Sequence, residues 1–206
     1  MNIPDNIKYI LERIHKSEDE WKALYMAAWG CVYYINEKYK KLGLWEAKLN
    51  FGLPGSKNKM HPYTPKELDS ILRTRDIEFT LGHLQTLFSL LEELSDSASE
   101  ILLDLESNMS KWKYIEQFFQ KIGLSQPIIK ELCLAKQTRN CFIHNGSKID
   151  KLWLNTYQEA RGVLPSNLDG KNLGEGLLNI FHQIEDWHDL IVNTAEKIKE
   201  KISQRS

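Results

Sequence analysis

The residues best suited to chemistry stand together in the segment Arg139–Gly146, which reads RNCFIHNG. Arg139, Asn140 and His144 combine a permanently charged donor, an amide and a group that titrates near neutral pH. A guanidinium binds phosphate oxygens through its N–H donors, and an imidazole can transfer a proton at physiological pH. These residue types at this spacing indicate a site for phosphate chemistry.

A helix that begins around Ser125 is expected to carry this segment and to stop at Asn145 and Gly146. Arg139 falls in the middle of its apolar stripe, at a position where a leucine would be expected. The stripe consists of Ile128, Leu132, Ala135 and Phe142. Because a buried guanidinium is costly without a partner, Arg139 should face an anion or several acceptors.

A second face of the same helix carries Asn140 and His144, four residues apart, together with Ile129 and Cys133. Arg139 and His144 are five positions apart and therefore differ by roughly 140° around an ideal helix. Either the helix loosens near its end or the arginine side chain wraps around it. A purely structural role is the alternative, with Arg139 bonding a neighbouring helix backbone and His144 capping its own helix.

The order Arg139-Asn140-x-x-x-His144-Asn145-Gly146 near a helix end resembles the R-x4-6-H signature of the HEPN family. The continuation through Ser147–Asp150, a loop and a long final helix also resembles the layout of that family. The family contains small all-helical proteins, many of them metal-independent ribonucleases of prokaryotic toxin and antiviral systems. In it, two copies pair across a two-fold axis, which brings both motifs into one cleft.

The resemblance implies an endoribonuclease that leaves 2′,3′-cyclic phosphate and 5′-hydroxyl ends and uses no cofactor. His144 would transfer protons, Arg139 would stabilise charge on the phosphate, and Asn140 would orient the phosphate or His144. The implied partners are RNA, a second copy of the chain and, for a role as a toxin, an antitoxin protein. The alternative is a non-catalytic helical module that binds a nucleotide, RNA or a partner protein through the same cleft.

The composition is that of an ordinary globular chain, with 206 residues, 42% hydrophobic residues, 27% charged residues and a formal net charge of −1. It predicts a single domain over residues 1–206. No apolar run approaches the ~18 residues of a membrane-spanning helix, and the N-terminus has no secretory signal pattern. Three scattered cysteines without CxxC spacing favour reduced thiols and a cytoplasmic location.

The periodicity predicts an all-α fold, an irregular bundle of about five helices. Helices are expected over about 5–15, from an N-cap at Ser17 to Gly43, from Thr64-Pro65 to between 95 and 106, over 111–122, and over about 173–202. The segment 147–172 is expected to be irregular and anchored by Trp153, Leu154 and Tyr157.

Two further regions allow two interpretations each. The loop 43–64 interleaves aromatic residues with lysines, which suits base stacking, although aromatic packing on the bundle is the simpler role. The final turns of the chain carry Lys197, Lys199, Lys201 and Arg205, which indicate a solvated face rather than an RNA patch.

Metal binding is the rival chemistry. Glu12-x-x-His15 and Glu185-x-x-His188 have the spacing found in di-iron carboxylate bundles, which also need a glutamate from each of two further helices. Glu78 is one candidate, but no inward-facing pair is evident. The sequence therefore predicts no metal site.

Overall fold

The computed structural model describes residues 3–48, 63–103, 112–163, 168–171, 173 and 181–205. Its elements are α1 (Asp5–Lys41), α2 (Pro65–Leu103), α3 (Trp112–Lys121), α4 (Gln126–His144), α5 (Lys151–Arg161) and α7 (Phe181–Gln204). No β-strand occurs within these ranges. The predicted all-α class is confirmed.

The first helix is longer than predicted. The expected break at Ser17 is wrong, because α1 continues without interruption from Asp5 to Lys41. No glycine or proline stands near Ser17, and its hydroxyl lies 3.4 Å from Nδ1 of His83 instead of capping a helix end. A tertiary partner thus replaces the local capping role that serine often takes.

The start of α2 follows the predicted capping box. Thr64 Oγ1 accepts a hydrogen bond from the Glu67 amide at 3.1 Å, and the Glu67 carboxylate accepts one from the Thr64 amide at 2.7 Å. Pro65 occupies the first helical position. The helix does not break near Ser95, whose hydroxyl donates to the Leu91 carbonyl at 2.7 Å inside the helix.

The segment after α4 is more regular than predicted. The expectation of an irregular chain over 147–172 is wrong for Lys151–Arg161, which form α5. Asp150 caps this helix by accepting from the Trp153 amide at 2.8 Å, and Gly162 ends it with a left-handed φ of 73°. Trp153 is completely buried, which confirms its predicted anchoring role.

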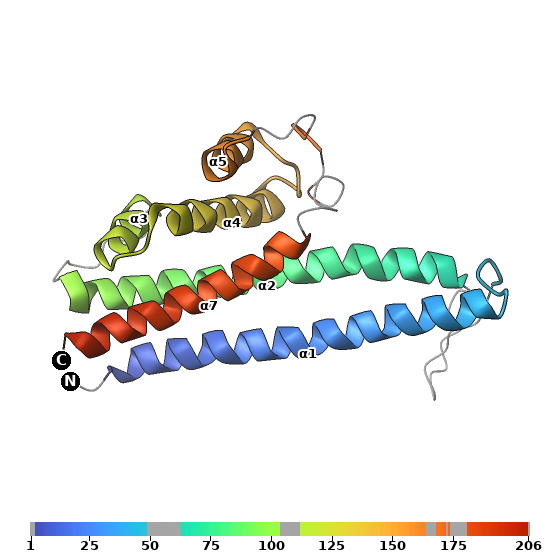
Figure 1. Cartoon of the computed structure of the whole chain (residues 1–206), viewed down its shortest axis with the longest axis horizontal. Helices are drawn as coiled ribbons and strands as arrows, with labels where there is room; N and C mark the ends of the chain where they lie inside the picture. The colour runs from blue at the N-terminus through green and yellow to red at the C-terminus, as the bar shows by residue number, and fades with distance from the viewer. Residues whose placement is uncertain are drawn as a thin grey trace. The chain divides into compact units, whose positions relative to one another are not determined.

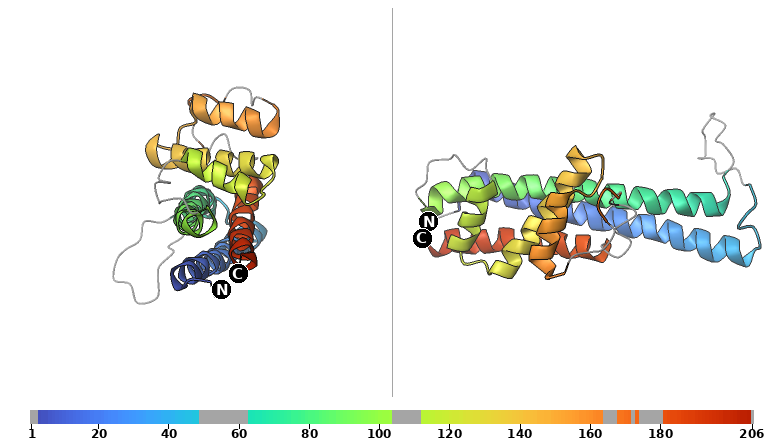
Figure 2. Two further views of the ribbon diagram at one scale, coloured as in Figure 1. Left: turned by 90° about the vertical axis from the view of Figure 1, so that its left-hand side faces the viewer. Right: turned by 90° about the horizontal axis from the view of Figure 1, so that it is seen from above.

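The described chain divides into two compact units, Met1–Asp19 with Thr80–Ser206, and Glu20–Phe79. The single domain over 1–206 stays a prediction. Within the first unit, the N-terminal part of α1, the C-terminal part of α2 and α7 lie together, α4 packs over them, and α5 covers α4 from outside (Figures 1 and 2). The core of this unit includes Ile14, Phe88, Trp153 and Trp187.

The second unit contains the C-terminal part of α1 and the N-terminal part of α2. Asn36 donates to the Asp69 carboxylate at 2.8 Å, and Trp21 stacks on Tyr25 with ring centroids 5.0 Å apart. Several large apolar side chains of this unit are exposed, among them Met26, Tyr33 and Leu42. None of the described helices is long and apolar enough to cross a membrane.

Candidate active site

The ends of α4 agree with the prediction. Ser125 is the N-cap in an extended conformation and Pro127 lies in the first turn. At the other end Asn145 is the C-cap, and Gly146 has a φ of 57°, which favours glycine. The amides of Asn145 and Ser147 both donate to the Cys141 carbonyl, at 3.2 and 3.0 Å. The motif therefore stands on a helix with a defined end.

The centre of the buried stripe differs from the prediction. Thr138, completely buried, occupies the core position that was assigned to Arg139, and Arg139 lies half-buried at the edge. The Thr138 hydroxyl donates to the Leu134 carbonyl at 3.0 Å and accepts from the indole Nε1 of Trp153 at 2.8 Å. These two bonds satisfy a hydroxyl in the core, so a threonine can take this position and the arginine can point outward.

Arg139 makes two long hydrogen bonds. Nη1 donates to Oδ1 of Asn140 at 3.3 Å and Nη2 donates to the hydroxyl of Ser89 on α2 at 3.4 Å. Its Nε is shielded from solvent and has no acceptor among the described residues. Because both Nη bonds are long, Nη1 and Nη2 can turn to a phosphate without the loss of a strong hydrogen bond.

His144 occupies the last turn of α4 and is exposed. Within the described part of the chain, His144 makes no hydrogen bond or ion pair. The Cys141 carbonyl at this helix end accepts from the backbone amide of Asn145, and the His144 side chain does not cap it. The predicted structural role of His144 as a helix cap is therefore not seen. Its imidazole is available to a ligand.

The structure brings Arg139 and Asn140 together, but it does not bring Arg139 and His144 together. The helix remains regular to His144, because the Asn145 amide still bonds the carbonyl four residues before it. The suggested loosening of the helix is thus wrong. The arginine reaches toward the neighbouring face instead, where its Nη1 meets the Asn140 amide oxygen.

A second cation stands one turn before Arg139. Burial lowers the pKa of Lys136 from its usual value, while Glu92 on α2 acts in the opposite direction and Arg139 adds to the lowering. Two cations on consecutive turns of one helix repel each other, and a bound anion would relieve that repulsion. Lys136 was not singled out from the sequence.

A hydrogen-bond network holds the end of α4 to the start of α5. Asn145 donates to Asp150 at 2.5 Å, and the same carboxylate caps α5. Glu131, nearer the start of α4, accepts from Arg161 at 3.0 Å and from the Trp187 indole at 3.2 Å. The helix that carries the motif is therefore bound to α5 at its C-terminal end and to α5 and α7 nearer its start.

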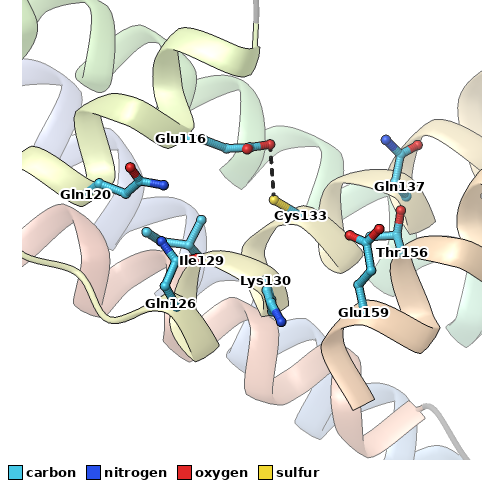
Figure 3. A pocket seen from close by; sticks show the side chains of 9 residues that line it. All are labelled: Glu116, Gln120, Gln126, Ile129, Lys130, Cys133, Gln137, Thr156 and Glu159. Carbon is cyan, nitrogen blue, oxygen red and sulfur yellow. Dashed lines mark hydrogen bonds between the residues drawn. The ribbon is translucent and has the colours of Figure 1, made fainter. Parts of the chain in front are cut away.

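Ile129 and Cys133, which were predicted to share a face with Asn140 and His144, line a pocket of about 250 Å³ between α3, α4 and α5 (Figure 3). Ile129 is 3% exposed, and the Cys133 thiol donates to Glu116 at 3.3 Å. Ile129 is therefore part of the chain's own core and is not available to a second copy. Asn140 and His144, at the end of this face, are half-buried and exposed, and Cys133 is half-buried beside the pocket.

No disulfide joins the three cysteines, all of which lie in described helices. Burial raises the pKa of Cys141, inside the motif, to about 11. Its thiol is therefore neutral at physiological pH and cannot serve as a nucleophile.

At pH 7.5 we expect iodoacetamide to modify exposed Cys31 and to leave Cys141 unmodified until the protein unfolds. A pKa of about 11 leaves less than about one thiolate per thousand at that pH. Peptide mapping by mass spectrometry, with and without denaturant, measures both sites. Equal labelling rates of the two residues in the folded protein would contradict this assignment.

The other predicted candidates have partners of their own. Trp45 stacks under Lys40, with the ammonium 4.7 Å from the ring centroid, which agrees with packing on the chain itself. Lys197 donates to the Gly123 carbonyl at 2.9 Å, Lys199 pairs with Glu196, and Arg205 bonds the Ile101 carbonyl. Residues 49–62 of the predicted loop lie outside the described ranges.

The di-iron arrangement, which was the rival interpretation of the sequence, is not seen among the described side chains. Glu12 and Glu78 are exposed, and His15 pairs with Glu196 at 2.7 Å. The side chain of Glu185 is not among those that the structure describes. His188 instead lies beside Glu18 and His83, two residues that the Glu-x-x-His spacing does not include.

A signal for this group was present in the sequence. Glu18 stands four residues after Ile14 and three before Trp21, and His188 has the same relation to Ile184 and Ile191. Polar residues that take apolar stripe positions on two helices are candidates for a shared buried site.

No protein-family model, no curated protein and no solved structure matches this chain.

Proposed function

We propose that this protein is a metal-independent endoribonuclease of the HEPN type. The observation that supports it most is the state of the two motif side chains. Among the described residues, Arg139 makes two long hydrogen bonds through Nη1 and Nη2, and His144, exposed at the end of the same helix, makes none. A charged donor and a proton carrier, both available at one helix end, suit phosphate-ester cleavage.

In the proposed reaction the 2′-oxygen of the RNA attacks the adjacent phosphorus and the bond to the 5′-oxygen breaks. His144 accepts the 2′-hydroxyl proton, and a proton is returned to the leaving 5′-oxygen, so that no proton is gained or lost overall. Arg139 stabilises the charge that develops on the non-bridging oxygens. Asn140 holds the guanidinium through its amide oxygen.

The test is incubation of the purified protein with mixed RNA in excess chelator, followed by analysis of the ends. We expect fragments with 2′,3′-cyclic phosphate and 5′-hydroxyl ends. Fragments that appear only after magnesium or manganese is added would contradict the proposal. A role in toxin–antitoxin or antiviral systems, with an antitoxin as partner, rests on the family resemblance and belongs to the same proposal.

A non-catalytic binding module is the second candidate. It is favoured by the separation of Arg139 from His144 around a regular helix. The same incubation distinguishes the two, because a binding module would retard RNA on a native gel and leave its length unchanged.

We expect the protein to be a two-fold dimer in which the C-terminal ends of two α4 helices approach each other. One chain alone leaves Arg139 and His144 apart, and a second copy can supply the missing group. Light scattering after gel filtration should give twice the chain mass of 24.1 kDa. A monomer at tens of micromolar would exclude the composite site.

Two variants locate the interface. Ile143→Glu adds a charge beside His144 and should give monomers. Met26→Glu changes an exposed apolar residue of the unit Glu20–Phe79 and should leave the dimer intact. If Met26→Glu dissociates the dimer and Ile143→Glu does not, the composite site is wrong.

A further inference from the structure

Three helices of the first unit bring a carboxylate and two imidazoles together in the core. Glu18 comes from α1, His83 from α2 and His188 from α7, and one ligand atom of each lies within 4.8 Å of the other two. Their exposed fractions are 4%, 9% and 0%. Charged groups are rarely buried to this extent unless they are paired or bind a metal.

Each member of this cluster has an apolar residue one turn away on its own helix. Ile14 precedes Glu18 by one turn, Leu87 follows His83 by one turn, and Ile184 precedes His188 by one turn, all three with 0% exposure. The Thr80 hydroxyl, one turn before His83, is also buried and has no hydrogen-bond partner among the described residues. A buried hydroxyl and a buried imidazole therefore stand one turn apart on α2.

The geometry is close to that of metal ligands. Oε2 of Glu18 lies 3.1 Å from Nε2 of His83. Two ligand atoms that are each about 2.1 Å from one ion stand roughly 3.0–3.4 Å apart. The rings of His83 and His188 are 4.6 Å apart between centroids and inclined at 81°. A modest shift of His188 would complete a three-ligand set.

The second nitrogen of His83 is already oriented. Nδ1 lies 3.4 Å from the Ser17 hydroxyl, which leaves Nε2 toward Glu18. Metal-binding histidines commonly hold their other ring nitrogen by such a contact.

We propose that Glu18, His83 and His188 form a buried site for a divalent transition metal that fastens α1, α2 and α7 together. Two imidazoles and one carboxylate suit Zn²⁺ or Fe²⁺, whereas Mg²⁺ and Ca²⁺ prefer sites made of oxygen ligands alone. The positive ion adds to His83 in offsetting the charge of the Glu18 carboxylate, which is 4% exposed. None of the three ligands belongs to the Arg139–His144 motif, so this site and metal-free RNA cleavage are compatible.

The first experiment uses the full chain. Metal-depleted protein is titrated with Zn²⁺, Co²⁺ or Mg²⁺ and followed by thermal unfolding and by the visible spectrum of the Co²⁺ form. We expect one equivalent of Co²⁺ to bind, with d–d bands of a nitrogen and oxygen site. Zn²⁺ at a hundredfold excess over its Kd should raise the Tm by about 5–10 °C. No shift and no Co²⁺ band at 100 µM metal would overturn the proposal.

The second experiment assigns the ligands. His188→Gln and His83→Gln should lose the Co²⁺ band and the zinc-dependent Tm shift. His15→Gln removes a half-exposed histidine that pairs with Glu196, and this variant should keep both signals. If His188→Gln and His83→Gln bind the metal as the parent does, the ligand assignment is wrong. If both fail to fold, the parent titration alone decides whether the metal binds.

Discussion

An RNA oligonucleotide with one 2′-deoxy sugar immediately 5′ to a cut position should resist cleavage at that position, while neighbouring positions are still cut. Arg139 and His144 can supply charge stabilisation and proton transfer, but neither provides a hydrolytic nucleophile. Cys141 cannot provide one either, because its thiol is buried and its pKa is raised to about 11. In the proposed reaction the attacking oxygen comes from the substrate, and the 2′-hydroxyl that supplies it distinguishes RNA from DNA.

The measurement compares the deoxy-substituted and the parent oligonucleotide in excess chelator, with the cut positions read on a denaturing gel. A 2′-deoxy sugar placed two nucleotides away serves as the matched control and should leave the cut unchanged. Cleavage at the normal rate at the substituted position would rule out attack by the 2′-oxygen. The proposed metal site is tested separately, because the titrations of the Glu18, His83 and His188 cluster with Co²⁺ and Zn²⁺ contain no RNA.

The variants Arg139→Ala and His144→Ala should each lower the cleavage rate by about 10²–10⁴-fold. The helical circular dichroism spectrum should remain nearly unchanged. His144 is exposed and makes no hydrogen bond within the described residues, so its truncation removes almost no packing. Arg139 is half-buried, and the two hydrogen bonds that it makes with described residues are long, at 3.3 and 3.4 Å, so its loss should also leave the fold intact.

Matched variants separate a catalytic role from a general loss of charge. Lys130→Ala removes an exposed cation from the same helix and should keep the parent rate. Arg139→Lys keeps the charge but loses the planar donor arrangement. Its cleavage rate should lie between those of the parent and Arg139→Ala. If Arg139→Ala and His144→Ala both fold and cut RNA at the parent rate, the site is elsewhere in the molecule.

The sequence by itself determined the features that depend on short-range chemistry. The all-α class follows from helical periodicity, the start of α2 from the capping box of Thr64 and Glu67, and the end of α4 from Asn145 and Gly146. These signals work because capping, left-handed turns and apolar periodicity involve residues only a few positions apart. The motif residues and the family resemblance could also be read from one short segment.

Only the tertiary structure decided which polar residues lie in the core. Ser17 looked like a helix cap but contacts His83, and Thr138 took the buried position assigned to Arg139 because Trp153 supplies a hydrogen bond from α5. Glu18, His83 and His188 meet only after three helices have packed. In the sequence of α1, α2 or α7 alone, the cluster residue is a polar residue on an apolar stripe. Local spacing does not reveal which residues of the other two helices it will contact. Long-range packing selects these partners, since a buried polar group is stable only where another element satisfies it.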